Sequence, residues 1–195
     1  MNDFTVSICI VAYNEQDCLP MLFDNILAQT YPKSQTEIVF VDSCSKDNTK
    51  QLFSEFKEKH NSEYKNIMIA DNPKKLQASG WNVAITQSSG DIIVRIDAHA
   101  QIPPEFVQNN VNHHKEGEMV TGGARPNIID GDTPYKRTLL MAESSMFGSS
   151  IADFRRNSEK RYVKSLFHGA YRREVFEKSG LYNEALGRTE DNEMS

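Results

Sequence analysis

The first half of the chain alternates short apolar runs with segments whose apolar residues recur at helical spacing. Val6–Ala12 reads V-S-I-C-I-V-A, a nearly continuous apolar run that is typical of a strand buried on both faces of a parallel sheet. Leucine, phenylalanine and isoleucine then recur every three or four residues over Leu19–Leu27, which predicts a helix with Pro20 in its first turn. Asn14 is a candidate N-cap for this helix.

The same strand and helix unit recurs, and a fourth strand follows it. The predicted strands are Ile38–Val41, Ile67–Ala70 and Ile92–Ile96; one intervening helix buries Leu52, Phe53 and Phe56, and the next spans Leu76–Ile85. This alternation predicts right-handed crossovers and an α/β fold with an open, doubly wound, mostly parallel sheet flanked by helices. Ligands of such sheets bind beyond the carboxyl ends of the strands, so candidate chemistry is expected there.

The pattern becomes less regular after the fourth strand. The predicted elements are a helix opened by Pro103 and Pro104 and running to about His114, a short strand at Met119–Thr121, a helix from Tyr135 to about Ser150, and an edge or antiparallel strand at Val163–Phe167. Boundaries in this half are therefore less sharply defined by the pattern than those in the first half.

Length and composition fit one domain that spans residues 1–195. A chain of 195 residues with 38% hydrophobic residues can bury one substantial core. No apolar run approaches the roughly 18 to 20 residues that span a bilayer, and the N-terminus lacks the pattern of a secretion signal. We therefore expect a soluble, cytoplasmic segment.

Charge and cysteine content exclude several other classes of protein. The net charge of −5 argues against a surface that coats nucleic acid, although a local basic pocket for one phosphorylated ligand remains compatible with it. Cys9, Cys18 and Cys44 are odd in number, and their spacing fits neither a disulfide framework nor a paired-cysteine zinc site. Reduced thiols are expected.

Polar residues follow the predicted strands at the points where the strands end. They are Tyr13, Asn14 and Glu15 after the first strand, Asp42 after the second, and Asp97 and His99 after the fourth. Carboxyl ends of parallel strands share one edge, so these side chains are expected to converge. Helix capping is the alternative interpretation for single residues, such as Asn14 paired with Asp17, or Asp42 in the turn before the next helix.

The loop after the first strand lacks the usual means of binding a diphosphate. It reads A-Y-N-E, with neither a G-x-G-x-x-G turn nor a P-loop, so a divalent cation is the candidate that would neutralise a nucleotide diphosphate. Asp97 and His99 can anchor this cation. Their carboxylate suits Mg²⁺ or Mn²⁺, and the imidazole favours Mn²⁺. The alternative is a strand-terminal turn with His99 facing solvent.

Five segments, in the same order and spacing, resemble family 2 of the glycosyltransferases with the GT-A fold, and among them the succinoglycan-type polysaccharide glycosyltransferases. The segments are V-S-I-C-I-V-A-Y-N-E at Val6–Glu15, I-V-F-V-D-S-C-S-K-D-N-T at Ile38–Thr49, A-S-G-W-N ending at Asn82, G-D-I-I-V-R-I-D-A-H-A at Gly90–Ala100, and T-E-D at Thr189–Asp191. The resemblance covers almost the whole chain. It implies a metal-assisted, inverting enzyme of polysaccharide or glycoconjugate synthesis. Such an enzyme moves a sugar from a nucleotide sugar, with a UDP-sugar favoured, to a hydroxyl of a glycan or lipid-linked acceptor.

The resemblance also assigns roles to individual residues. Ala12, Tyr13 and Glu15 line the nucleoside pocket, Asp42 accepts a hydrogen bond from the base, Lys75 and Asn82 close the nucleotide pocket, and Asp97 is the first acid of the D-x-D motif. His99 stands where the family usually has the second, metal-coordinating acid. His168, Arg172 and Arg173 are lesser candidates near the diphosphate.

The acidic pair at Glu190 and Asp191 matches the catalytic acids of the family, with Asp191 as the base. The acceptor hydroxyl is a poor nucleophile, so a carboxylate must take its proton as the hydroxyl attacks the anomeric carbon opposite the departing diphosphate. One such displacement inverts the anomeric centre. A helix capped by Thr189, with both acids in its first turn, is compatible with this role.

Two other functions are alternatives to this one. A sugar-phosphate nucleotidylyltransferase would carry a glycine-rich, basic loop after the first strand, whereas A-Y-N-E-Q-D is acidic and lacks glycine. In a non-catalytic nucleotide-sugar-binding module the chemistry would be absent, but Asp97 and Asp191 are both present. The family normally continues beyond the equivalent of Ser195, so the resemblance implies a domain truncated at its C-terminus and a full-length protein associated with the cytoplasmic face of a membrane.

Overall fold

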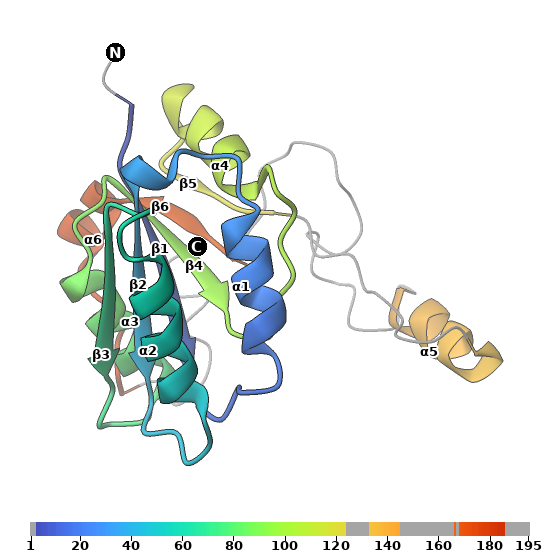
Figure 1. The fold of residues 1–195 in the computed structure, drawn as a ribbon. Coiled ribbons are helices and arrows are strands. Elements are labelled where there is room, and N and C mark those ends of the chain that lie inside the picture. Colours follow the sequence, from blue (N-terminus) through green and yellow to red (C-terminus); the bar gives the residue numbers. More distant parts are fainter. Residues whose placement is uncertain (1–2, 124–132, 145–165, 167, 186–195) are drawn as a thin grey trace.

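A six-stranded sheet forms the centre of the molecule in the computed structural model, which describes residues 3–123, 133–144, 166 and 168–185 (Figure 1). The strands are β1 (Val6–Ala12), β2 (Thr36–Asp42), β3 (Asn66–Asp71), β4 (Ile92–Asp97), β5 (Val120–Thr121) and β6 (Ala170–Arg172). Their spatial order is β3-β2-β1-β4-β6-β5. Strands β1 to β4 are parallel, and β6 is antiparallel to both β4 and β5. The predicted mostly parallel sheet is thus confirmed.

Helices connect the strands and cover both faces of the sheet. They are α1 (Leu19–Leu27), α2 (Thr49–His60), α3 (Gln77–Gln87), α4 (Phe106–Lys115) and α6 (Arg173–Ser179), with a short 3₁₀ turn at Lys33–Gln35. The described residues also form helix α5 (Pro134–Ser144), which does not cover the sheet (Figure 1). No helix among the described residues is long and apolar enough to cross a membrane.

The strand side chains alternate between two separate cores, which is why the strands read as continuous apolar runs. Ile8, Ile10 and Phe40 face the layer that contains α1, α2 and α4. There the ring of Phe40 stacks on Phe53 with 4.4 Å between the ring centroids. Cys9, Val39 and Val41 face the opposite layer, which contains α3 and α6 and buries Trp81. Both faces of the central strands are therefore removed from water.

The order in which successive strands are added to the sheet reverses at β1. The first two crossovers place α1 and α2 on one face as the chain proceeds from β1 to β2 and β3, whereas α3 returns on the other face to β4 on the far side of β1. This arrangement makes the carboxyl ends of β1 and β4 the switch point of the sheet. Ligands of open α/β sheets bind at such a point.

The structure corrects the predicted cap of α1. Cys18, not Asn14, is the N-cap residue, and no side-chain hydrogen bond caps the helix. Asn14 lies earlier, with a φ of 56°, and its side-chain oxygen accepts a hydrogen bond of 2.8 Å from the Lys46 amide. The amide side chain therefore stabilises the neighbouring loop rather than the helix.

Two predictions in the second half fall partly outside the described residues. Helix α5 ends at Ser144 within the described part, and residues 145–150 of the predicted helix lie outside it. Of the strand predicted at 163–167 only Leu166 is described, and it is not in a strand. The antiparallel strand that pairs with β4 is instead Ala170–Arg172.

Candidate active site

The carboxyl ends of three adjacent strands bring several predicted residues to one edge of the sheet. Ala12 pairs with Asp42 at the ends of β1 and β2, and Val11 pairs with Asp97 at the end of β4. Asp42 is 3% exposed, and its carboxylate accepts hydrogen bonds of 3.2 and 3.3 Å from the Ser45 amide. Asp42 thus stabilises the turn that follows β2, as the alternative interpretation expected, and its recognition of a base remains a prediction.

Cross-linking hydrogen bonds hold the loop after β1 against the loop after β2. The Asn14 amide donates to the Ser45 hydroxyl at 3.0 Å, and the Glu15 amide donates to the Thr49 hydroxyl at 2.8 Å. Tyr13 lies in the same loop with 48% of its surface exposed. The two loops therefore form a fixed rim from which the Tyr13 ring is accessible to a ligand.

A contact between Glu15 and His99 joins the loop after β1 to the loop after β4. Their nearest side-chain atoms, Oε1 and Nδ1, are 3.1 Å apart. The His99 side chain is 59% exposed, whereas that of Glu15 is 23% exposed. Both residues were predicted at this edge, but no sequence pattern signals their pairing, because they are far apart in the chain.

The carboxylate of Asp97 lies beside a second histidine. His168 Nε2 is 3.6 Å from Asp97 Oδ2, and both side chains are largely buried. Burial raises the pKa of Asp97, but the adjacent His168 and the charges of Arg95 and His99 outweigh it, so the pKa lies below its ordinary value. Asp97 is consequently a carboxylate at neutral pH. Its neighbourhood includes His168, which the sequence analysis gave only a minor role.

The chemistry of this edge fits a divalent cation that shares its ligands with a substrate. Among the described residues, no group of three His, Cys, Asp or Glu side chains could hold a metal ion by itself. Asp97 and His99 offer one carboxylate and one imidazole, a donor set that Mn²⁺ accepts. A cation held by one or two protein side chains takes further ligands from substrate phosphates, as is common for Mg²⁺ sites.

Left-handed backbone conformations gather in the loops at the same edge. Among the described residues, the non-glycine residues with positive φ are Asn14, Cys44, Lys75 and His168. They follow β1, β2 and β3 and precede β6, whose start lies at this edge because β6 runs antiparallel to β4. Such conformations are costly for L-residues and concentrate at functional sites. Asparagine and histidine are enriched in this region, whereas cysteine and lysine are not, so residue type gives no sign of the conformation at Cys44 and Lys75.

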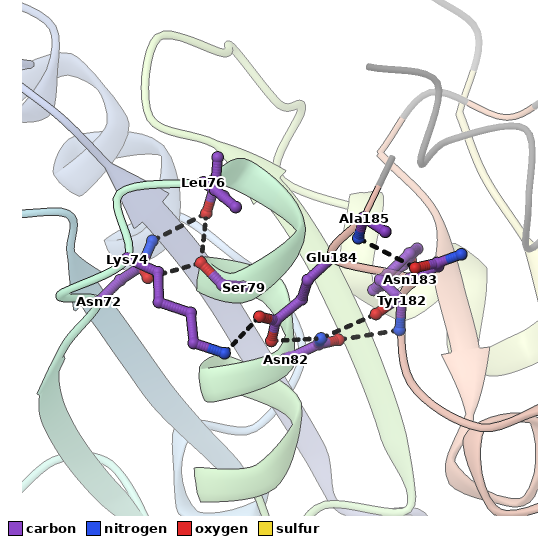
Figure 2. A network of polar contacts seen from close by, with 9 residues as sticks. All are labelled: Asn72, Lys74, Leu76, Ser79, Asn82, Tyr182, Asn183, Glu184 and Ala185. Carbon is purple, nitrogen blue, oxygen red and sulfur yellow. Dashed lines mark hydrogen bonds and ion pairs between the residues drawn. The ribbon is translucent and has the colours of Figure 1, made fainter. Parts of the chain in front are cut away.

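Lys75 and Asn82 occupy different surroundings. Lys75 is exposed in the loop after β3. Asn82, in α3, is 8% exposed, and its side chain is bonded to the segment that contains Tyr182 and Glu184 (Figure 2). The side chain of Lys75 is therefore accessible to a nucleotide, whereas the side-chain amide of Asn82 already has partners within the protein.

Both arginines considered for the diphosphate lie toward the opposite end of the sheet. Arg172 pairs with Ile92 at the start of β4 and donates a hydrogen bond of 2.7 Å to the His114 carbonyl. Arg173 donates one of 2.7 Å to the Gly90 carbonyl. These contacts place both guanidinium groups away from the predicted site. The predicted catalytic residues Glu190 and Asp191 lie outside the described residues.

Comparison with curated proteins gives relatives over most of the chain. A dolichyl N-acetyl-alpha-D-glucosaminyl phosphate 3-beta-D-2,3-diacetamido-2,3-dideoxy-beta-D-glucuronosyltransferase of Methanococcus voltae is 33% identical over 110 residues, which cover 56% of this chain and 34% of that protein. An undecaprenyl-phosphate 4-deoxy-4-formamido-L-arabinose transferase of Yersinia pestis is 32% identical over 169 residues, covering 84% of this chain and 51% of that protein. The chain therefore spans about half of these relatives' length, or less.

Solved structures share the fold. TarS 1-349 of S. aureus, in complex with UDP, superposes with a TM-score of 0.70 at 21% identity, covering 96% of this chain and 53% of that chain. The mannosyltransferase PcManGT of Pyrobaculum calidifontis, in complex with GDP-Man and Mn²⁺, gives a TM-score of 0.67 at 22% identity, covering 99% and 51%. At these identities the likeness concerns the fold alone, and it confirms the predicted GT-A architecture.

A model of one protein family accounts for most of the sequence. It matches residues 7–180, from β1 to the end of α6, and so includes every strand of the sheet and all the polar strand ends described above. With this match and the fold in agreement, the chain belongs to glycosyl transferase family 2.

Proposed function

We propose that this chain is the donor-binding and catalytic domain of an inverting glycosyltransferase of the hexosyltransferase type, with a UDP-sugar as its favoured donor. The observation that carries the proposal is Asp97, a carboxylate with a lowered pKa at the switch point of the sheet, in a chain of glycosyl transferase family 2. A negative group at this position needs a cation to coexist with a diphosphate. That requirement matches the chemistry of sugar transfer from nucleotide sugars.

The loops after β1 and β2 would bind the nucleoside. The fixed rim presents the exposed Tyr13 ring, with Ala12 and Glu15 beside it, while the buried Asp42 offers an acceptor for a base N–H. Lys75, exposed after β3, would approach the diphosphate from the other side of the pocket. The donor is thereby oriented with its diphosphate near the end of β4.

Asp97 and His99 would hold Mn²⁺ or Mg²⁺, with Mn²⁺ favoured. The cation, when bound, stabilises the charge that builds on the departing diphosphate. Glu15 Oε1 lies 3.1 Å from His99 Nδ1, and this contact would hold the imidazole in one orientation. Asp191 would take the proton of the attacking acceptor hydroxyl, with Glu190 beside it, and attack opposite the leaving group inverts the anomeric centre.

The acceptor is proposed to be a glycan or a lipid-linked molecule, as in polysaccharide or glycoconjugate synthesis. The names of two relatives support this class, since they specify a dolichyl phosphate and an undecaprenyl phosphate. Lipid-linked acceptors reside in membranes, so the complete protein is proposed to work at the cytoplasmic face of a membrane.

The donor proposal is tested by calorimetry with UDP and GDP in the presence of Mn²⁺. We expect UDP to bind more tightly than GDP. We also expect Asp97→Asn to weaken UDP binding at least about tenfold, because the cation loses its carboxylate ligand. Asp24→Asn, at an exposed position of α1, is the matched control. Equal affinity in chelator, or an unchanged affinity of Asp97→Asn, would show that the cation site is elsewhere.

The product distinguishes the rival nucleotidylyltransferase reaction from sugar transfer. Incubation with a sugar phosphate and a nucleoside triphosphate would release pyrophosphate in that case, and we expect none. Pyrophosphate release that depends on Asp97 would replace the glycosyltransferase proposal with the rival one.

A further inference from the structure

The segment Tyr182–Ala185 is bound to α3 through the side chain of Asn82 (Figure 2). The Asn82 amide nitrogen donates to the Tyr182 carbonyl at 2.9 Å and to Glu184 Oε1 at 3.2 Å, and its oxygen accepts from the Tyr182 amide at 2.9 Å. An asparagine side chain has two N–H donors and one carbonyl oxygen. Both donors and the oxygen are therefore used within the protein, which leaves no N–H for a nucleotide.

A second contact fastens the same segment to the loop after β3. Lys74 Nζ is 2.5 Å from Glu184 Oε2, so Glu184 is held by Lys74 on one oxygen and by Asn82 on the other. The Lys74 side chain is 64% exposed, and an exposed ion pair contributes little by itself. The buried Asn82 amide is consequently the main attachment.

Arg95 connects the segment to the strand that ends in Asp97. Its guanidinium carbon lies 4.3 Å from the Trp81 ring centroid and 4.9 Å from that of Tyr182. Arg95 also donates a hydrogen bond of 2.7 Å to the Tyr182 hydroxyl. Arg95 and Asp97 are two positions apart on β4, so their side chains lie on the same face of the sheet. Tyr182 is thereby fixed to both α3 and the strand of the proposed cation site.

We propose that Asn82 is a positioning residue for the transfer step and not a nucleotide ligand. By clamping Tyr182 and Glu184 it sets the point from which the chain proceeds to the catalytic pair Glu190 and Asp191. The inference rests on the proposed function and differs from the role that the family resemblance implies for Asn82. An amide is required because the clamp needs a donor and an acceptor on one side chain.

The clamp is tested with Asn82→Ala, and Asn112→Ala, an exposed amide on α4, is the matched control. Hydrogen exchange at the Tyr182 amide should accelerate at least about tenfold in Asn82→Ala, because its acceptor is lost. The affinity for UDP with Mn²⁺ should stay within about twofold, while the rate of transfer at saturating donor falls at least about tenfold. Asn112→Ala should match the parent in all three measurements.

A rescue distinguishes positioning from a general loss of packing. Asn82→Asp keeps an acceptor for the Tyr182 amide but sets a carboxylate against Glu184. Exchange at the Tyr182 amide should therefore be faster than in the parent, and sugar transfer should be slower. Adding Glu184→Gln supplies an amide donor that a carboxylate at position 82 can accept. The double variant should regain part of the protection and part of the transfer rate.

Any of three results would overturn the inference. A loss of UDP affinity that accounts for the whole loss of transfer would make Asn82 a nucleotide ligand. Unchanged exchange at Tyr182 in Asn82→Ala, or unchanged transfer despite faster exchange, would show that the clamp does not position the reaction. If the proposed function itself is wrong, the parent protein will transfer no sugar. The exchange experiment would still decide whether the clamp exists.

Discussion

At the scale of single residues, backbone conformation marks the proposed site as clearly as side-chain chemistry does. Cys44 and Lys75 adopt φ angles of 62° and 60°, although neither is a residue type that favours the left-handed region, and His168 has a φ of 50°. No sequence pattern reports this, because the usual signal would be glycine or asparagine. The sequence did predict Asp97 and His99 at the edge, since a polar residue directly after a buried strand needs no knowledge of long-range contacts.

Lys75 offers a test in which backbone and charge can be separated. Lys75→Gly relieves the left-handed conformation while removing the ammonium group, so folding stability should change by no more than about 1 kcal/mol. UDP affinity should fall several-fold because the diphosphate loses a cation. Calorimetry and urea unfolding measure the two effects, and Lys75→Arg, which keeps the charge, is the comparison. Unchanged UDP affinity in Lys75→Gly would remove Lys75 from the nucleotide site.

At the scale of elements, the strand and helix units of the first half could be predicted because β1, β2 and β4 are continuous apolar strands buried on both faces. Beyond β4, the short strand predicted at Met119–Thr121 corresponds to β5, whereas β6 was predicted at the wrong residues, because three residues are too few to show any period. Their pairing also depends on contacts between distant parts of the chain. The same reason explains why the bond between Asn82 and Tyr182 was not foreseen.

A buried carboxylate joins elements at the end of the sheet opposite the proposed site. Glu37, 2% exposed, accepts hydrogen bonds from the Ser7 hydroxyl at 2.6 Å, from the Ser89 amide and hydroxyl, and from the Gly90 amide at 3.1 Å. Burial raises the pKa of Glu37, but these hydrogen bonds outweigh it and hold the pKa below the ordinary value of 4.5. The glutamate thus connects β1, β2 and the turn before β4.

The lowered pKa predicts how stability depends on pH. A carboxyl that is more acidic when folded contributes stability above its unfolded pKa of 4.5, and this contribution is lost as pH falls through the folded pKa. Glu37→Gln should lower the free energy of unfolding at pH 7 by about 1–3 kcal/mol, since an amide cannot accept all these bonds. In urea unfolding between pH 7 and pH 3, the free energy of unfolding should fall less steeply with decreasing pH in the variant than in the parent. An equally steep decline would assign the acid sensitivity to other groups.

Gly80 allows α3 to approach β1 closely. A Cβ atom at position 80 would lie 2.6 Å from Val11 Cγ1 and 3.1 Å from Asn72 Nδ2. Helix propensity alone favours alanine by up to about 1 kcal/mol, but the clash requires α3 to move, and overpacking typically costs about 1–3 kcal/mol. Gly80→Ala should therefore destabilise the protein in urea, whereas Thr86→Ala, exposed on the same helix, should not. A stabilised Gly80→Ala variant would mean that α3 and β1 accommodate the added methyl group without a loss of stability.

At the scale of the whole molecule, the fold divides the proposed reaction between two regions of the sequence. The loops after β1, β2, β3 and β4 hold the predicted donor residues, whereas the predicted base follows the segment clamped by Asn82. The fold class and the donor edge could be predicted because a doubly wound sheet fixes where its ligands bind. How the second region is attached could not, since the attachment depends on contacts that Asn82, Lys74 and Arg95 make with residues far along the chain.

This division predicts that donor binding and chemistry can be separated by one substitution. Asp191→Asn keeps the shape of the side chain but cannot accept the proton of the acceptor hydroxyl, so transfer should fall by about 10²–10⁴-fold. UDP affinity of Asp191→Asn should remain near that of the parent, because the donor residues are unaffected. Asp97→Asn should instead weaken UDP binding. Sugar transfer and calorimetry on the same preparations provide both measurements. Full turnover by Asp191→Asn would remove Asp191 as the base while leaving the donor site intact, because that site depends on the strand ends and not on the catalytic pair.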